Sequence, residues 1–404
     1  MESRTQVNIN TVKDTGWLVS FWRVILVGLL MAGLVCPAHA GSAEQARRIH
    51  ERLTGVPSSD SDFILMRDAI ASGDASGAAY IAMNNVNFYN VTLKNFAAPW
   101  TNRDQSVFVP MNDYIATVIG MIRDSDTISF DRLLWDDITY VGRPGIVADA
   151  PSRSNNLHYE QLEAGQVNLR DDLQPALQSS IQNIPTGATA GIMTSRAASE
   201  AFFVAGTNRA MFRFTLLNHM CNDMEQMHDT RIPPDRVRQD VSRSPGGDSR
   251  LFLNGCIGCH AGMDPMAGAF AYYNFDDSIG ELVYDDTAVH TKYFNNDLNF
   301  PQGYRTSDDS WQNRWREGQN AYLGFDGALP GSGNGAKELG RELASSEAFA
   351  SCQVRKVFRT VCLRDAEDVP DRTAITTIMN TFFVNKGYSM KQVFADSAVH
   401  CMGP

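Results

Sequence analysis

One five-residue motif constrains this chain more than any other feature: residues 256–260 read Cys-Ile-Gly-Cys-His. In a helical turn, side chains at positions i and i+3 lie on one face, so both thiols can bond to the same flat ligand. The histidine that follows them can then bind an iron atom at the centre of that ligand. C-x-x-C-H is the attachment sequence of c-type haem. We therefore predict one covalently bound haem c, attached through Cys256 and Cys259, with His260 as the proximal axial ligand of its iron.

Three other uses of these residues compete with haem. A structural zinc site needs four ligands, and the sequence holds no second C-x-x-C and no H-x-x-x-H pair. A thioredoxin-like redox pair is expected near a βαβ pattern, which the sequence lacks. A plain disulfide beside an unrelated histidine is the third alternative. With the Cys and His content of this chain, the motif would arise by chance on the order of 0.2% of the time, so covalent haem is favoured.

The first forty residues have the pattern of an export signal. Arg4, Lys13 and Arg23 precede an uncharged apolar run over residues 24–35, and residues 38–40 read Ala-His-Ala. This succession predicts a signal peptide cleaved near Ala40, and hence a periplasmic or secreted protein. The run is too short to cross a hydrocarbon layer of ~30 Å, and no later stretch is long enough, so we expect no membrane span in the mature chain. A lipid anchor at Cys36 is an alternative that its neighbour Val35 fits poorly.

The net charge and the spacing of apolar residues limit what the rest of the chain can fold into and bind. The net charge is −11, which excludes a nucleic-acid binder because such proteins need a basic surface. Short helical patterns dominate, so we predict a mainly α, irregular multi-helix protein with at most a small β-hairpin, pairing residues 282–284 with residues 290–294. We divide the chain into the signal peptide (1–40), an N-terminal helical region (41–235), a c-type haem module with an acidic insert (236–335) and a C-terminal helical segment (336–404).

Residues around the motif are similar to a known family. Residues 263–265 read Met-Asp-Pro and residues 273–276 read Tyr-Asn-Phe-Asp. This succession resembles the planctomycete-type cytochrome c proteins, which are exported bacterial proteins. Residues 206–221 and 343–359 look like the helices that flank the family's haem module, and residues 130–141 match more weakly. The chain departs from the family after Asp276, where an acidic insert runs to about Gly333. The resemblance implies an electron-transferring haem module and leaves the partner open.

An electron-carrying haem needs a second axial ligand, usually Met or His. Met220, Met224 and Met227 recur at helical spacing in a helix predicted over residues 208–227, a pattern that core packing also produces. We take Met220 as the first candidate for the distal ligand, with His290 and His219 as alternatives and an open iron site as a further one.

The four remaining cysteines of the mature chain suit disulfides in an oxidising compartment. Cys352 and Cys362 are ~15 Å apart if one helix holds both, which is too far for a bond. We favour Cys362–Cys401, with buried free thiols as the alternative.

Three functions remain open at this point. The first is an exported mono-haem c-type cytochrome that transfers single electrons to a redox partner protein. The second is a haem enzyme with an open iron site, similar to a peroxidase or an oxidase. The third is a ligand-binding protein with an accessory haem. A six-coordinate, low-spin iron would favour the first over the second.

Overall fold

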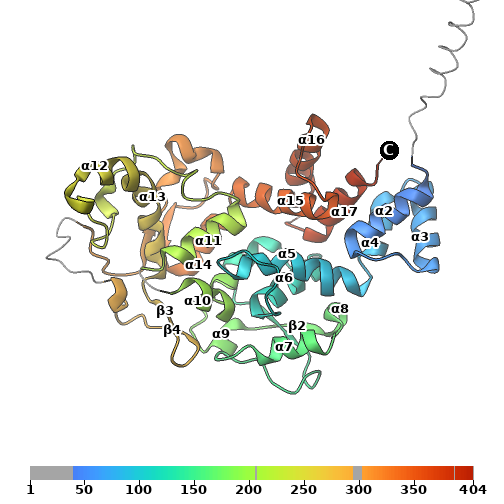
Figure 1. The fold of residues 1–404 in the computed structure, drawn as a ribbon, viewed down its shortest axis with the longest axis horizontal. Coiled ribbons are helices and arrows are strands. Elements are labelled where there is room, and N and C mark those ends of the chain that lie inside the picture. The colour runs from blue at the N-terminus through green and yellow to red at the C-terminus, as the bar shows by residue number, and fades with distance from the viewer. Residues whose placement is uncertain (1–39, 205–206, 294–302, 386, 404) are drawn as a thin grey trace, which may run out of the picture. The chain divides into compact units, whose positions relative to one another are not determined.

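The computed structural model describes residues 40–204, 207–293, 303–385 and 387–403. The predicted signal peptide lies outside these residues, apart from Ala40. Helices dominate, and strands occur in the described residues as three small antiparallel pairs, which confirms the predicted mainly α fold (Figure 1). Among the described helices, none has the length and apolar character needed to cross a membrane.

The chain begins with three short helices that pack on one another. They are α2 (Ser42–Thr54), α3 (Asp60–Ala71) and α4 (Ala75–Ala82). Side-chain oxygens cap two of them, because Ser59 accepts from the amide of the third residue of α3 and Asp74 does the same for α4. The π-helix η1 (Phe88–Leu93), α5 (Lys94–Ala97) and η2 (Ala98–Thr101) lead to α6 (Asp113–Arg123). Helix α6 is buried from its first residue to Ile122, so it forms the centre of this region.

Helix α6 packs against β1 (Thr139–Gly142), which pairs antiparallel with β2 (Leu173–Ala176). Short helices complete this region: η3 (Phe130–Leu134), α7 (Leu157–Ala164), α8 (Leu169–Asp172), α9 (Gln178–Gln182), η4 (Gly191–Thr194) and α10 (Arg196–Phe202). Helix α11 (Arg209–Met220) follows, and it ends seven residues before the predicted end at Met227. The prediction was wrong there because Cys221 adopts a left-handed backbone with φ of 53° and is tied by a disulfide to Cys352.

The motif opens α13 (Ile257–Ala267), which follows α12 (Ser249–Leu251) and the π-helix η7 (Phe252–Cys256). Strand β3 (Tyr273–Asp276) then pairs antiparallel with β4 (Glu281–Tyr284). The predicted hairpin was therefore wrong in its partner, since residues 282–284 pair with β3, while residues 291–293 form the short helix η9 and residue 294 lies outside the described residues. A tight turn ending at Gly280, with φ of +71°, makes the nearer pairing possible. A third pair joins β5 (Ser310–Gln312) to β6 (Ser332–Asn334).

Four helices end the chain: α14 (Gly335–Ala344), α15 (Glu347–Cys362), α16 (Val369–Thr377) and α17 (Met390–Cys401). The remaining short helices are η5 (Pro234–Arg236), η6 (Pro245–Gly247), η8 (Gly268–Phe270), η9 (Thr291–Tyr293), η10 (Arg314–Arg316), η11 (Gly318–Leu323) and η12 (Ile378–Val384). Helix α17 packs against α4 and α15, and the disulfide Cys362–Cys401 is present as predicted. Residues 42–403 form one unit with one large core, to which all three predicted segments of the mature chain contribute.

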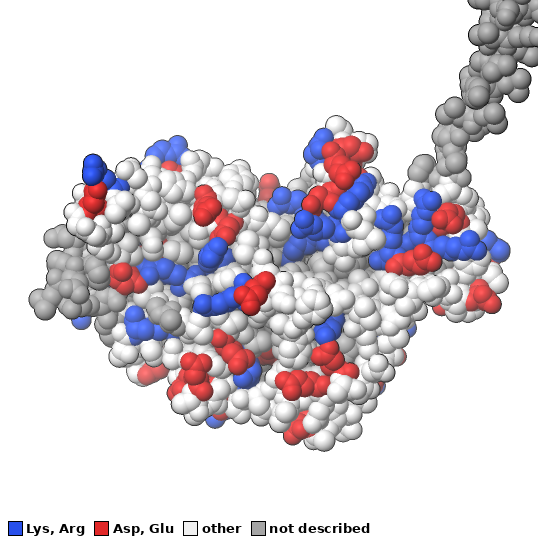
Figure 2. Space-filling view, viewed as in Figure 1, with Lys and Arg blue, Asp and Glu red and all other residues white. Residues whose placement is uncertain are grey.

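Lys and Arg side chains gather near α15 and α2, although the chain as a whole is acidic (Figure 2). Two of these cations have structural partners. Arg52 donates to the carbonyl oxygens of Val361 and Cys362 at the end of α15, at 3.3 and 3.1 Å. Arg48 donates to the carbonyl oxygen of Met402, just after α17, at 3.2 Å. Both guanidinium groups therefore stabilise helix C-termini, where carbonyl groups lack partners within the helix.

Candidate functional site

The two cysteines of the motif sit at the start of α13. Cys256 is the N-cap residue of the helix, and Cys259 lies in its first turn. Both thiols are free and half-buried, whereas the other four cysteines in the described residues form disulfides. The plain disulfide considered for this pair is therefore not formed in the structure. Burial raises the pKa of the Cys259 thiol, and the charge of Glu225 raises it further.

His260 is oriented by a carboxylate one turn later in the same helix. Its Nδ1 lies 3.1 Å from Oδ1 of Asp264, and its side chain is 23% exposed while that of Asp264 is fully buried. An ionised carboxylate can only accept a hydrogen bond, so Nδ1 is the donor in this pair, and in the neutral form of the ring the lone pair is then on Nε2. This is the arrangement found where a histidine binds a metal, because the second nitrogen then fixes the tautomer and the ring orientation.

Asp264 stays ionised because cationic and backbone donors surround it. Nε and Nη2 of Arg209, from the start of α11, lie 2.7 and 2.8 Å from its two oxygens. The backbone N–H of Arg238 donates to Oδ2 at 3.1 Å. Burial by itself would raise the pKa of Asp264, but the charge and hydrogen bonds of Arg209 hold that pKa well below its usual range. The sequence offered one signal for this role, the spacing of four residues between His260 and Asp264.

The opposite side of the motif packs against the segment that follows α11. The Cys259 thiol donates to the carbonyl oxygen of Met224 at 3.3 Å, and the N–H of Asp229 donates to the carbonyl oxygen of Gly258 at 3.0 Å. The His228 ring lies directly over Gly258, and the Trp315 indole lies over Gly262. Residues 224–229, of which 224–227 were predicted as helix, thus support the turn that carries the two thiols.

Apolar side chains beside the motif face solvent. Leu251 and Leu253, in the two short helices before Cys256, are 55% and 53% exposed. Large side chains of this type are usually buried. Cys256, Cys259 and His260 are the residues that would hold a c-type haem, through two free thiols one turn apart and an imidazole.

The three candidates for the distal ligand lie in different surroundings. Met220 is the last residue of α11 and is fully buried. It is eleven residues from Arg209, about three turns, so both side chains lie on the same face of the helix. Arg209 contacts Asp264 late in α13, whereas Met224 contacts Cys259 near its start. The end of α11 that carries Met220 is therefore the end nearer the two thiols.

The two histidines have other partners in the structure. The backbone N–H of His290 donates to the carbonyl oxygen of Ala271, which follows the end of α13. His260 lies about 10 Å from that end, measured along the helix axis. His219 is fully buried, with its Nε2 2.7 Å from the hydroxyl of Tyr114. Burial and the charge of Lys356 hold the pKa of His219 well below its usual value. These positions weigh against both histidines and leave Met220 as the better candidate.

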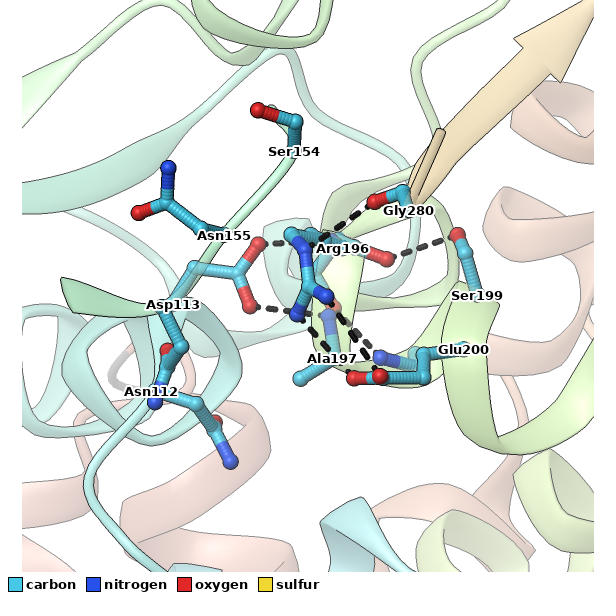
Figure 3. A network of polar contacts seen from close by, with 12 residues as sticks. Asn112, Asp113, Ser154, Asn155, Arg196, Ala197, Ser199, Glu200 and Gly280 are labelled. Atoms are coloured by element: carbon cyan, nitrogen blue, oxygen red, sulfur yellow. Dashed lines mark hydrogen bonds and ion pairs between the residues drawn. The ribbon is translucent and has the colours of Figure 1, made fainter. Parts of the chain in front are cut away.

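A second polar network joins α6, α10 and the β3–β4 hairpin (Figure 3). The carboxylate of Asp113 accepts from the backbone N–H groups of Arg196 and Ala197, at 2.6 and 3.1 Å, and so caps α10. The guanidinium of Arg196 donates to Glu200 at 3.0 Å and to the carbonyl oxygen of Gly280 at 3.2 Å. Beside it lies a cavity of about 530 Å³ that is lined mainly by polar side chains, among them Asn112, Asn155 and Glu160. The network links the N-terminal region to the module that carries the motif.

In the part of the chain that the structure describes, no group of three or more His, Cys, Asp or Glu side chains is close enough to hold a metal ion. Comparisons of the chain with protein-family models, curated proteins and solved structures found no match.

Proposed function

We propose that this protein is an exported mono-haem c-type cytochrome that transfers single electrons to a redox partner protein. The observation that carries the proposal is the pairing of two free thiols, at Cys256 and Cys259, with an imidazole that a buried carboxylate orients. A haem bound there would supply reversible one-electron exchange at its iron. The resemblance to planctomycete-type cytochrome c proteins supports the same function.

The residues of the chain have separate roles in this proposal. Cys256 and Cys259 hold the porphyrin edge, and Nε2 of His260 binds the iron. Asp264 keeps the proton on Nδ1 and thereby fixes the imidazole in its binding tautomer. Met220 is the proposed distal ligand, because it lies on the same face of α11 as Arg209, and Arg209 contacts α13 through Asp264.

The attachment is tested by replacing both thiols. We expect denatured wild-type protein, isolated after export, to keep a haem absorbance that acid-acetone does not extract. Cys256→Ala with Cys259→Ala should abolish this absorbance while export continues. The matched control is Cys362→Ala with Cys401→Ala, which removes two cysteines that adjoin neither the motif nor Met220 and should keep the haem. Wild-type protein that contains no haem, or releases it freely, would show that the proposal is wrong.

A haem enzyme with an open iron site is the second candidate, and one observation favours it. The carboxylate at Nδ1 of His260 makes the imidazole a stronger electron donor, and an electron-rich proximal ligand favours cleavage of O–O bonds. The optical spectrum separates the two functions. If Met220 binds the iron, wild-type protein is low-spin, and Met220→Ala shifts it to high spin or lets imidazole bind. A high-spin wild-type spectrum that Met220→Ala leaves unchanged would favour the enzyme.

A further inference from the structure

Three buried or nearly buried charged side chains follow one another behind His260. The carboxylate of Asp264 accepts from His260 at Oδ1 and from Arg209 at both of its oxygens. The other edge of the Arg209 guanidinium binds Asp240, with Nη2 2.7 Å from Oδ1. The side chains of Arg209 and Asp240 are 20% and 16% exposed, and that of Asp264 is fully buried. Charges interact strongly over such distances where water is largely excluded.

We infer that Arg209, shared between Asp264 and Asp240, is a positioning residue that sets the reduction potential of the haem at His260. The inference rests on the proposed function, since it needs haem at the motif. Arg209 does not touch His260, so it acts through Asp264. Asp240 in turn acts through Arg209.

The direction of each effect follows from the charges. A carboxylate hydrogen-bonded to the proximal imidazole stabilises the ferric iron, which carries one more positive charge than ferrous iron. Arg209 weakens that effect, because two of the hydrogen bonds that Asp264 accepts come from its guanidinium. Asp240 competes with Asp264 for the same guanidinium and so partly restores the effect.

Opposite shifts are therefore expected from the two outer residues. Arg209→Gln removes a positive charge and leaves Asp264 a stronger acceptor, and both changes lower the potential. Asp240→Asn removes a negative charge and leaves Asp264 as the one carboxylate bound to the Arg209 guanidinium. Both changes raise the potential. We expect each variant to change the ferric-to-ferrous ratio at a given potential about three-fold to ten-fold. A ten-fold change corresponds to ~59 mV for one electron, so each shift is about 30–60 mV.

A matched control separates tuning from simple loss of a buried ion pair. Arg316 binds Glu342 through Nε at 2.8 Å, and their side chains are 20% and 1% exposed, close to the values for Arg209 and Asp264. Arg316→Gln thus removes an equally buried pair that does not include Asp264. We expect it to lower stability and to leave the potential within about 10 mV of wild type.

The experiment is a spectroelectrochemical titration of the full-length exported protein and its variants, after covalent haem is checked in denatured samples. Opposite shifts for Arg209→Gln and Asp240→Asn support the inference. Shifts in the same direction, or shifts no larger than that of Arg316→Gln, overturn it and leave the proposed function standing. Wild-type protein without covalent haem overturns both. If Arg209→Gln does not accumulate, Arg209→Lys takes its place, with a smaller shift expected in the same direction. A value for Arg209→Lys equal to wild type overturns the inference.

Discussion

Replacing Gly262 by alanine tests how closely α13 packs against the aromatic side chain behind it. A Cβ atom at this position would lie 2.7 Å from Cε2 of Trp315 and closer still to its Nε1. Trp315 is fully buried, and its ring centroid is 5.8 Å from that of Phe212 on α11, so the indole has little room to move. Overpacking of this kind costs roughly 1–3 kcal/mol. Because both contacts are far inside van der Waals distance, we take the upper part of that range, about 2–3 kcal/mol. Alanine gains about 1 kcal/mol over glycine within a helix, which leaves a net loss of about 1–2 kcal/mol.

Gly258→Ala is the matched substitution, one turn earlier in the same helix. Its Cβ would lie 2.5 Å from the His228 ring, but that ring is half-exposed and can turn towards solvent. The gain in helix propensity should then remain, and stability should stay equal to wild type or rise by up to about 1 kcal/mol.

Urea unfolding followed by tryptophan fluorescence gives the free energy of unfolding for both variants. A loss of 1 kcal/mol lowers Tm by roughly 2–4 °C in a domain of 150–250 residues, and by less in a larger one. The reasoning fails if Gly262→Ala is as stable as wild type, or if Gly258→Ala is the more damaging of the two. Either result would mean that Trp315 is not held against α13 as the structure places it.

Two further predictions concern stability. Replacing Cys221 and Cys352 by alanine opens a loop of 131 residues, for which chain entropy predicts a loss of up to about 5 kcal/mol; an unchanged urea midpoint under non-reducing conditions would contradict this. Hydrogen bonds from Arg364 and then from His400 hold the pKa of Asp371 below its usual range, although burial opposes them. A lowered folded-state pKa stabilises the protein above the unfolded-state value of about 3.9, and this contribution is lost as pH falls below it. Asp371→Asn should therefore lower the urea midpoint at pH 7, by a difference that narrows below about pH 4; a constant difference down to pH 2 would refute this reasoning.

Local sequence patterns predicted the fold class and one of the disulfides. Helical spacing of apolar residues accounts for elements such as α6 and α15, because that spacing depends only on near neighbours. Helix length excluded a Cys352–Cys362 bond, and Cys362–Cys401 was the favoured one of the pairings that remained. The end of α11 could not be found in this way, since residue 221 is neither Gly nor Pro. Its left-handed backbone goes with a disulfide to a residue 131 positions later, which no local pattern records.

Part of the candidate site could likewise be predicted from local sequence, and part depends on contacts between residues far apart in the chain. The motif could be recognised from the sequence because its three functional side chains lie within five residues. Asp264 was also within reach, four residues after His260, but its burial and charge depend on partners far away in sequence. Arg209 lies 55 residues before Asp264, and Trp315 lies 53 residues after Gly262. Such contacts arise only when α11, α13 and the acidic insert pack together.

Asp264 and Arg209 act in opposite directions on an iron held by His260. The carboxylate at Nδ1 of His260 stabilises ferric iron, whereas the Arg209 guanidinium, which donates to that carboxylate, weakens this effect. A carrier needs both oxidation states within reach of its partner, and an enzyme that cleaves O–O bonds needs an electron-rich iron. If the effect of Arg209 outweighs that of Asp264, the wild-type potential is high and electron transfer is favoured. If the effect of Asp264 is the larger, the potential is low and the open-site enzyme becomes the better interpretation.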